Sequence, residues 1–558
     1  MLFECLFVKF CNMKKIIIEN KLLVILLLMC VGTLLMFSAH HSGILIDYGR
    51  EVYYPQEILG GKVLYKDLFN IYGPLAYQIN ALLYKIFGAN LSTLYGAGTI
   101  SSLLIVSGIY LVAQKFLSKF LSFAIGFFTI VVGVATTSIF NFYFPYSWAL
   151  VYGLIAFLFS LYFLLKFNDT KNFKNLYISS FLAGFALTCK YDFLFYVLVV
   201  LFFIIKFKNW KALLCFIFAP MLSFGILFIQ GLGLNDLLNS LFITSQMAKT
   251  KTLTYFYQNS GIYFHHKVLL TDLVSFLKTA IPFTAILLGV NLFDKNKKFA
   301  LILSLIGWIL FFNLFDVKFA FIFLPILLLC LLIFTLIKQR FEQVKNWNIV
   351  ILGISTLAVC AKVFWAICLG SYGNYYVSIA MIAVFAILFR YLPKKLEDVT
   401  TIAVIFMSIL IFLTNSLKKS LDNYKISTPK GTMYTTKFYA ESSNKLIDYL
   451  KTQTDKDDKV IIFPEGMTIN FLAERKSDDL INSLLPLYVE TFGEDNIIEH
   501  FKKDMPKYII FNNLDMKDYY FRYICQDYAF KFCGFVQENY DLQMIIGNEF
   551  RYLIFKRK

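Results

Sequence analysis

Residues Asp47–Tyr77 read "DYGREVYYPQEILGGKVLYKDLFNIYGPLAY". This stretch lies between strongly apolar segments of a 558-residue chain that is 58% hydrophobic. It nevertheless carries four carboxylates and six tyrosines. Because only 15 acidic residues precede Lys418, the stretch holds an unusual share of them. Such a concentration of acidic and hydroxyl groups indicates a polar site set into an apolar protein.

The segments on either side are apolar runs that recur along most of the chain. The mean hydropathy is +0.65, and many runs are long enough to cross a lipid bilayer. We therefore expect a polytopic α-helical membrane protein with about 13 transmembrane helices. The expected spans are residues 22–39, 95–114, 120–137, 148–165, 176–189, 191–205, 212–231, 281–293, 299–315, 319–337, 348–369, 375–391 and 399–416. If the short pair 176–189 and 191–205 formed one broken helix, every later segment would change sides.

The basic residues indicate how these spans are oriented. The formal net charge is +17, and its excess lies before Lys418, where 32 basic residues face 15 acidic ones. In the expected scheme 17 of them fall in six short loops on one side, against about 10 in much more sequence on the other. The positive-inside rule then places the N-terminus in the cytoplasm and the C-terminal tail outside. A nucleic-acid partner is not expected, because the charge lies in loops rather than on one basic face.

The chain changes character after Ser416. The segments "DKVIIFPEG", "KYIIFNN", "LQMIIGN" and "RYLIFKRK" predict short strands, and "SNKLIDYLKTQ" and "DNIIEHFKKD" predict amphipathic helices. We divide the chain into a transmembrane module, residues 1–416, and an extracytoplasmic α/β domain, residues 417–558. Within this domain Cys525 and Cys533 either pair in an oxidising space or remain two half-buried thiols.

The quoted stretch belongs to the first outer loop, about residues 40–93. Its sequence predicts a short helix that breaks at Gly60-Gly61 and a second helix that starts at Pro74 and ends at Gly88. Both have the composition of helices that lie on a membrane surface. The loop is therefore expected at the lipid interface, where a lipid-linked substrate presents its head group.

The acidic residues of this loop are candidates for chemistry. Asp47 follows the first span, and Glu51 lies four positions later, on the same face if a helix has begun. A carboxylate there can accept the proton of an attacking hydroxyl or amine. It can also hold a divalent cation such as Mg²⁺ or Mn²⁺. The alternative is structural: Asp47 would cap a surface helix, and the tyrosines would simply mark the membrane interface.

The pattern "D-Y-G-R-E…I-L-G-G-K-V-L-Y-K-D…Y-G-P-L-A-Y" resembles the first extracytoplasmic loop of GT-C-fold glycosyltransferases. It is similar to bacterial members of glycosyltransferase family 39, the relatives of protein mannosyltransferases and of the lipid A aminoarabinose transferase. The resemblance covers the layout of the whole chain but only about 40 residues in motif. It implies that Asp47 is the acidic residue central to catalysis and that Asp67, in "YKD", is a second functional acid. Tyr48 follows Asp47, so the adjacent Asp-Glu pair of the eukaryotic protein mannosyltransferases is absent.

The resemblance also implies an activity and its partners. A membrane glycosyltransferase of the bacterial plasma membrane would move a sugar from a polyprenyl-phosphate donor to an envelope glycan, lipid or protein acceptor, with inversion. Such a donor needs cations for its phosphate, and Lys190 in "TCKYDF" and Arg50 are the candidates. Tyr48 and Tyr72 are the candidates for contacts with the sugar or the acceptor. The alternative for Lys190 is a snorkelling side chain paired with Asp192.

A transporter or flippase of lipid-linked sugars is the rival hypothesis. It would use charges at the membrane midplane, such as Lys362, and such proteins often show repeated halves. No repeat is evident, and the acids cluster at one surface instead. A third hypothesis, a non-catalytic scaffold for envelope assembly, gives the acidic loop no role.

Overall fold

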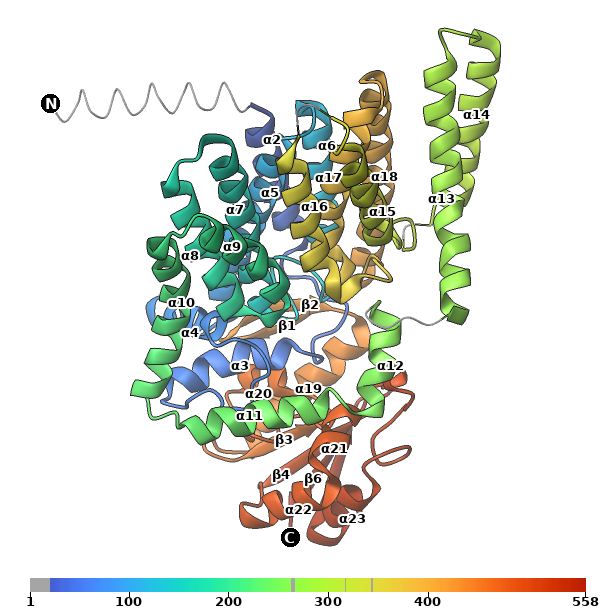
Figure 1. The fold of residues 1–558 in the computed structure, drawn as a ribbon. Helices are drawn as coiled ribbons and strands as arrows, with labels where there is room; N and C mark the ends of the chain where they lie inside the picture. The colour runs from blue at the N-terminus through green and yellow to red at the C-terminus, as the bar shows by residue number, and fades with distance from the viewer. Residues whose placement is uncertain (1–20, 262–265, 317, 343–344) are drawn as a thin grey trace, which may run out of the picture.

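The computed structural model describes residues 21–261, 266–316, 318–342 and 345–558. A long bundle of helices stands on a smaller α/β unit formed by the C-terminal part of the chain (Figure 1). The basic residues near the N-terminus, such as Lys14 and Lys15, lie outside the described residues. The apolar helices of the bundle are α2 (Lys21–Phe37), α5 (Leu91–Ala113), α6 (Lys119–Gly133), α7 (Trp148–Thr170), α8 (Phe173–Cys189), α9 (Leu194–Lys206), α10 (Trp210–Ile229), α13 (His266–Leu292), α14 (Lys297–Leu314), α15 (Leu324–Lys338), α16 (Trp347–Val359), α17 (Gly373–Tyr391) and α18 (Lys395–Leu421).

Every apolar run that the sequence predicts to span a membrane contains or overlaps one of these helices. In the part of the chain that the structure describes, seven helices are long and apolar enough to cross a membrane: α5, α7, α10, α13, α14, α17 and α18. Shorter apolar helices accompany them, and α8 and α9 are shorter or less apolar than a span requires by the same measure. The chain is thus a polytopic helical membrane protein, and the total of thirteen spans stays a prediction.

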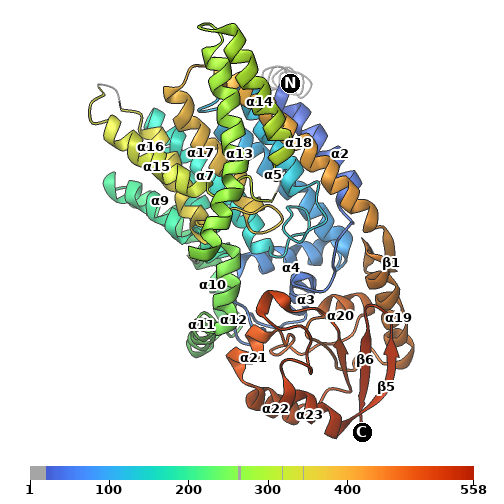
Figure 2. The same cartoon turned by 90° about the vertical axis from the view of Figure 1, so that its right-hand side faces the viewer.

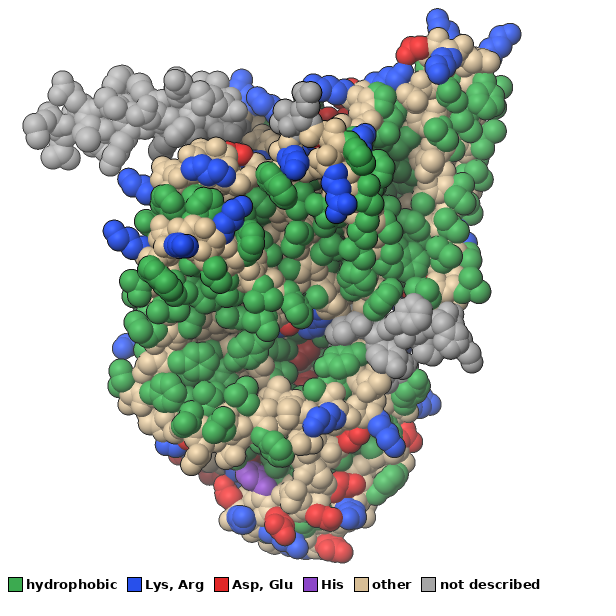
Figure 3. All heavy atoms as spheres, in the orientation of Figure 1, with side chains coloured by type: hydrophobic (Ala, Val, Ile, Leu, Met, Phe, Trp, Pro, Cys, Tyr) green, Lys and Arg blue, Asp and Glu red, His purple; other side chains and the backbone are tan. Residues whose placement is uncertain are grey.

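Burial separates the bundle into an inner and an outer part. Helix α17 is its centre, with 83% of its apolar stretch buried inside the protein. The α13–α14 hairpin is mostly exposed and lies at the edge of the bundle, where it contacts α18 (Figure 1). On the face that Figure 3 shows, apolar side chains cover the bundle in a band, and Lys and Arg gather at the end away from the C-terminal domain. Such a band fits a protein surrounded by lipid.

The first loop contains the two predicted helices, α3 (Tyr48–Leu59) and α4 (Leu75–Phe87). Helix α3 ends at Gly60, and Gly61 adopts the left-handed φ of 97° that glycine tolerates. Pro74 precedes α4, and Gly88, with a φ of 92°, ends it. The predicted breaks at these glycines and this proline are confirmed.

The C-terminal domain starts three residues after α18 with a hairpin that the sequence did not reveal. Its elements are β1 (Tyr424–Thr428), β2 (Gly431–Thr435), α19 (Lys437–Gln453), β3 (Val460–Phe463), α20 (Met467–Ala473), α21 (Pro486–Phe492), α22 (Glu494–Lys503), β4 (Tyr508–Asn512), η3 (Lys517–Tyr519), α23 (Phe530–Asn539), β5 (Tyr540–Ile546) and β6 (Tyr552–Arg557). The main sheet has the order β3-β4-β6-β5, with β3 parallel to β4 and the other pairs antiparallel. The four predicted strands and both predicted helices are confirmed.

A disulfide lies within this domain, and the long loop before α13 packs against it. Cys525 and Cys533 form a disulfide, which decides between the two predicted states of this pair. The long loop before α13 adds α11 (Leu234–Met247) and α12 (Lys251–Ser260), which run along the domain (Figure 1). There the carboxylate of Glu490 accepts hydrogen bonds from the backbone N–H groups of Lys251 and Thr252, at 2.7 and 3.1 Å.

Helix α3 packs directly on α20, so the first loop and the C-terminal domain meet at one end of the bundle (Figure 2). Gly49 makes this contact possible, because a Cβ atom there would lie 2.6 Å from the Cβ of Met467. The ion pair between Lys62 and Asp479, at 2.7 Å, joins the same two parts. This contact brings the acidic loop into a site that the helices alone do not complete.

Candidate active site

Asp47 lies at the turn between α2 and α3 in an unusual backbone conformation. Its φ of 63° is left-handed. This conformation costs a non-glycine residue about 1–3 kcal/mol and persists only where the surrounding structure holds it. Its side chain makes no capping hydrogen bond to α3. The carboxylate instead lies 3.2 Å from Nη2 of Arg50 and is 27% exposed. Asp47 thus occupies the N-cap position of α3 without a side-chain capping hydrogen bond.

The backbone of Asp47 is held by Glu465, which follows strand β3 of the C-terminal domain. The N–H of Asp47 donates to Oε2 of Glu465 at 2.9 Å, and the hydroxyl of Ser483 donates to Oε1 at 3.3 Å. Burial, and after it the charge of Asp47, raises the pKa of Glu465 to about 8. Glu465 is therefore mainly protonated at neutral pH, beside a carboxylate that is paired with arginine.

Arg50 joins the two predicted acids of α3. Its guanidinium donates to Asp47, to Oε1 of Glu51 at 3.1 Å, and to the backbone carbonyl of Tyr146 at 3.2 Å. Glu51 is only 1% exposed and accepts two further bonds, from the hydroxyl of Tyr77 and from the N–H of Trp148, both at 2.9 Å. Glu51 thus anchors Arg50 inside the protein, whereas Asp47 faces open space.

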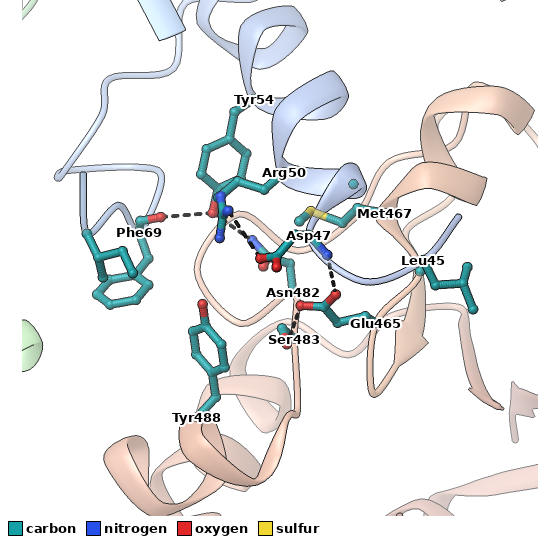
Figure 4. A pocket seen from close by; sticks show the side chains of 13 residues that line it. Leu45, Asp47, Arg50, Tyr54, Phe69, Glu465, Met467, Asn482, Ser483 and Tyr488 are labelled. Atoms are coloured by element: carbon teal, nitrogen blue, oxygen red, sulfur yellow. Dashed lines mark hydrogen bonds and ion pairs between the residues drawn. The ribbon is translucent and has the colours of Figure 1, made fainter. Parts of the chain in front are cut away.

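These groups line a cavity between the first loop and the C-terminal domain (Figure 4). Its volume is about 20 Å³, roughly the space of one water molecule, and it is partly open to solvent. Tyr54 bridges its walls: its hydroxyl donates to the carbonyl of Phe69 at 2.9 Å and accepts from Asn482 at 3.0 Å. The lining residues are Leu45, Asp47, Gly49, Arg50, Tyr54, Phe69, Ile71, Glu465, Gly466, Met467, Asn482, Ser483 and Tyr488.

A charged network holds the loop that carries Asn482 and Ser483. Asp478 is 2% exposed, lies 2.9 Å from the ring of His500 and 2.8 Å from Nζ of Lys459, and accepts the N–H of Ile481. Burial opposes the charge of Asp478, but the bonds from His500 and Lys459 hold its pKa well below the usual range. The loop is thus fixed by groups outside the cavity.

Two predicted site residues, Asp67 and Tyr48, do not line this cavity. Asp67 accepts the N–H of Val63 at 2.8 Å within a turn of the first loop and does not line the cavity around Asp47. These contacts therefore do not support the predicted catalytic role of Asp67. Tyr48 is fully buried, with its hydroxyl 3.2 Å from Nδ1 of His41, so it has no surface to offer a sugar. The burial of Tyr48 therefore does not support the expected contact with the sugar or the acceptor.

Lys190 and Tyr72 form a second group beside Arg50. Lys190 joins α8 to the short helix η1 (Tyr191–Phe193) and is 2% exposed, so it does not snorkel to a surface. Its ammonium donates to the hydroxyl of Tyr146 at 2.8 Å and lies 4.3 Å from the ring centre of Tyr72. The guanidinium of Arg50 lies 5.0 Å from the same ring. Burial, and after it the charge of Lys362, lowers the pKa of Lys190 to about 7.

Gly73 allows the segment that carries Tyr72 to approach Lys190 closely. Its N–H donates to the carbonyl of Cys189 at 3.1 Å, and a Cβ atom there would overlap the carbonyl of Thr188. The "YGP" segment therefore lies against the end of α8, which brings Tyr72 to Lys190. The sequence alone gave no sign of this contact, because the two segments are more than a hundred positions apart.

The expected divalent cation finds no evident donor set in this part of the molecule. Among the described residues, no group of three or more His, Cys, Asp or Glu side chains gathers that could hold a metal ion. Asp47 is paired with Arg50, and Glu465 binds the N–H of Asp47 and the hydroxyl of Ser483. Metal dependence stays a prediction.

No protein-family model and no curated protein matches the chain. Among solved structures, the oligosaccharyltransferase of Archaeoglobus fulgidus in complex with Zn and sulfate is 12% identical, over 89% of this chain and 69% of that one, with a TM-score of 0.49. ArnT from Cupriavidus metallidurans bound to undecaprenyl phosphate is 11% identical, over 95% and 97% of the two chains, with a TM-score of 0.47. Both likenesses are at low sequence identity and have TM-scores below 0.5, so they assign no class of protein to this chain. The likeness is one of layout, and no residue role follows from it.

Proposed function

We propose that the protein is a membrane glycosyltransferase that moves a sugar from a polyprenyl-phosphate donor to an acceptor on the outer side of the bacterial plasma membrane. The observation that carries this proposal is the carboxylate of Asp47. It is partly exposed in a cavity between two parts of the chain, is paired with the mostly buried Arg50, and sits on a left-handed backbone. A side chain held at this cost in an accessible cavity is a candidate for a functional role.

In the proposed reaction Asp47 acts as the base. Its carboxylate takes the proton of an acceptor hydroxyl or amine while that atom attacks the anomeric carbon of the sugar. The bond between this carbon and the phosphate oxygen breaks, and its electron pair leaves with the phosphate. The phosphodiester thereby becomes a phosphomonoester with one more negative charge. Inversion at the sugar is an expectation from the resemblance of the first loop to family 39.

Arg50 and Glu465 support Asp47 in this scheme. Arg50 holds the carboxylate of Asp47 at the cavity through the 3.2 Å contact. Protonated Glu465 accepts the N–H of Asp47 without placing a second full charge beside it. Cations near the departing phosphate stabilise the charge that develops there, and Arg50 and Lys190 were the predicted candidates.

The outer location is supported by the distribution of charge. Lys and Arg gather at the opposite end of the bundle, which is typical of a cytoplasmic face (Figure 3). A site on the outer side has no access to cytosolic nucleotide sugars, and a lipid-linked donor meets this constraint. The acceptor class, whether glycan, lipid or protein, stays open.

The test is sugar transfer in membranes that contain the Asp47→Asn protein, with polyprenyl-phosphate sugars as donors. Asn keeps the size of the side chain but cannot take the proton, so we expect transfer to fall roughly 10²–10⁴-fold. Asp495→Asn is the matched control, because Asp495 is 77% exposed on the C-terminal domain. Full transfer by the Asp47→Asn protein at normal expression would disprove the assigned base.

A further inference from the structure

A cavity lies at the end of the bundle away from the C-terminal domain, where α7 ends, α16 begins and α17 ends (Figure 1). Its volume is about 450 Å³, within the usual range of ligand pockets, and it opens widely to the surface. Helix α7 starts beside Glu51, which accepts the N–H of Trp148, and its 23 residues extend roughly 35 Å. The cavity is therefore about one membrane thickness away from the proposed site. Its lining residues are Asn168, Asp169, Lys171, Lys345, Asn346, Trp347, Asn348 and Arg390.

The acid in the wall of this cavity, Asp169, already has partners. Its carboxylate lies 2.7 Å from Nζ of Lys115 and accepts the side-chain amide of Asn348. The side-chain carbonyl of Asn348 accepts the amide of Asn168 at 2.8 Å. The side-chain carbonyl of Asn168 accepts the ammonium of Lys171 at 3.0 Å. These bonds tie the end of α7 to the start of α16 and form a preorganised polar wall.

The cavity has an excess of positive charge, even when every ion-pair partner of its walls is included. The charged residues of the walls and their partners are Lys115, Lys171, Lys345, Arg390, Asp169 and Glu342. Four basic residues thus stand against two acids, which leaves two positive charges. The two acids pair with Lys115 and Arg390. Among the residues that the structure describes, Lys171 and Lys345 therefore have no ion-pair partner.

The loops around the cavity do not balance this excess. The short loops at this end of the bundle hold 17 basic residues and five acids. The acids that lie outside the cavity and its ion pairs are Asp294, Glu397 and Asp398. Asp294 pairs with Lys395 at 2.7 Å, and Glu397 accepts the N–H of Ser118. An anion that enters the cavity is therefore attracted by its surroundings as well as by its walls.

Two general rules account for lysines at this end but not for their convergence. Basic loops follow from the positive-inside rule, and Lys171 also complements the dipole at the end of α7. Neither rule requires the lysines to meet at one concave site. Lys171 is directed there by a left-handed φ of 54°, which glycine or asparagine usually adopts at a helix end, and by its bond to Asn168. Lys345 reaches the same cavity from the segment before α16.

An apolar face leads from the cavity along α16 and favours a lipid over a soluble anion. Trp347 lines the cavity and is 53% exposed. Ile354, seven positions later on the same face, is 42% exposed. Tryptophan is enriched where a membrane meets water. A phospholipid presents its phosphate at this level and its acyl chains beside the apolar face, whereas a soluble anion would use the cavity alone.

We propose that this cavity binds the head group of an anionic phospholipid. Lys171 and Lys345 contact its phosphate, Asn348 forms part of the wall beside it, and Trp347 packs where the head group joins the acyl chains. Basic pockets between transmembrane helices on the cytoplasmic side are typical sites for anionic lipids. The bound lipid links the ends of α7 and α16. This site is independent of the proposed function, because it needs only the charge and shape of the cavity.

Native mass spectrometry of the purified full chain tests this site. The probes are phosphatidylglycerol and phosphatidylcholine with identical acyl chains, which share a phosphodiester but differ in net charge. We expect the first phosphatidylglycerol to bind about tenfold or more tightly than the first phosphatidylcholine. In Lys171→Gln/Lys345→Gln the two affinities should become nearly equal, because the attraction of two lysines for the anionic head group is lost.

A matched control separates the cavity from the general charge of this end. Lys119→Gln/Lys211→Gln removes the same charge from two exposed lysines that do not line the cavity, and it should keep the lipid preference. Thermal unfolding shows whether each variant is folded. Lys345→Gln alone changes one exposed loop residue and should lose part of the preference even if the double variant unfolds. An unchanged preference in Lys345→Gln and in the folded double variant, or an equal loss in the control, would overturn the proposal.

Free sn-glycerol 3-phosphate distinguishes a lipid site from a site for soluble phosphates. We expect millimolar concentrations of it to leave phosphatidylglycerol bound, because it lacks the acyl chains that lie along α16. Displacement of the lipid by this compound would show a site for soluble phosphates and would overturn the lipid assignment. None of these measurements involves Asp47, so their outcome and the outcome of the transfer assay are separable.

Discussion

Asp47 and Glu465 meet across 418 positions of sequence, and the two acids are not equivalent. Asp47 contacts Arg50 and is open to the cavity, whereas Glu465 is placed so that burial and its acidic neighbour favour its protonated form. A carboxyl group whose surroundings raise its pKa can stay protonated at neutral pH. Here the neutral member acts on the backbone of the charged member, through the N–H of Asp47.

This pairing predicts a pH dependence. The pKa of Glu465 is raised to about 8, so the stability that its neutral form contributes is complete below its ordinary pKa and is lost as pH rises through about 8. Above that pH two negative charges face each other between the first loop and the C-terminal domain. We expect transfer by the wild type to fall on the alkaline side.

Glu465→Gln isolates the effect, because Gln still accepts the N–H of Asp47 but cannot ionise. We expect near-normal transfer at pH 7 and a weaker decline between about pH 7.5 and 9. Glu465→Ala, which removes the acceptor, should impair transfer at every pH. Rates measured from pH 6 to 9.5 give the comparison, and identical alkaline limbs in the wild type and Glu465→Gln would exclude this titration as the cause.

Helix α3 carries both the catalytic candidate and the surface that meets the C-terminal domain. Its glycine at position 49 lets α20 approach so closely that a methyl group would lie 2.6 Å from Met467 and 2.9 Å from the backbone nitrogen of Thr468. The site therefore depends on how two elements from opposite ends of the chain pack. A change that separates them should affect transfer without touching any polar group of the cavity.

Gly49→Ala is expected to reduce transfer at least tenfold, since the backbone of α20 cannot yield as a side chain can. Gly43→Ala is the matched control, because a Cβ atom at Gly43 meets nothing within 4 Å. Limited proteolysis of both variants in membranes should show the linker before β1 cut faster in Gly49→Ala alone. Equal transfer by the two proteins would mean that close packing of α3 on α20 is not needed.

The elements that the sequence predicted are those with a local signal. Apolar runs marked the bundle helices, and Gly60, Pro74 and Gly88 marked the breaks in the first loop. Four short β-rich runs marked the main sheet. The β1–β2 hairpin escaped because β1 is mostly exposed and neither strand forms an apolar run. Local patterns also suggested Asp47, since few acids occur in the apolar part of the chain.

The rest of the site depends on contacts that no local pattern encodes. Glu465 follows β3, and nothing in its neighbourhood indicates that it binds the backbone of Asp47. Lys362 and Asp192 are 170 positions apart and meet only because two helix ends converge. Tyr48 belongs to a loop rich in tyrosines, and the turn of α3 directs it inward to His41.

Over the whole molecule, charge and polarity differ between the two ends of the bundle. One end carries short loops rich in Lys and Arg, and the other carries the first loop, the proposed site and the charge-balanced C-terminal domain (Figures 1 and 3). The contacts of Asp47 with Glu465 and of Lys62 with Asp479 tie the first loop to that domain. The two must therefore lie on one side of the membrane, whichever way the chain is inserted.

The orientation itself can be tested with introduced cysteines and a membrane-impermeant maleimide on intact cells. Glu549 is exposed on the C-terminal domain, and Lys208 is exposed in a basic loop at the other end. We expect Glu549→Cys to react in intact cells and Lys208→Cys to react only after the membrane is opened, because basic loops are retained in the cytoplasm. The unmodified chain gives the background from its own cysteines, among which Cys330 is exposed. Labelling of Lys208→Cys alone in intact cells would place the site in the cytoplasm. A lipid-linked donor would then lose its rationale, because nucleotide sugars are available on that side.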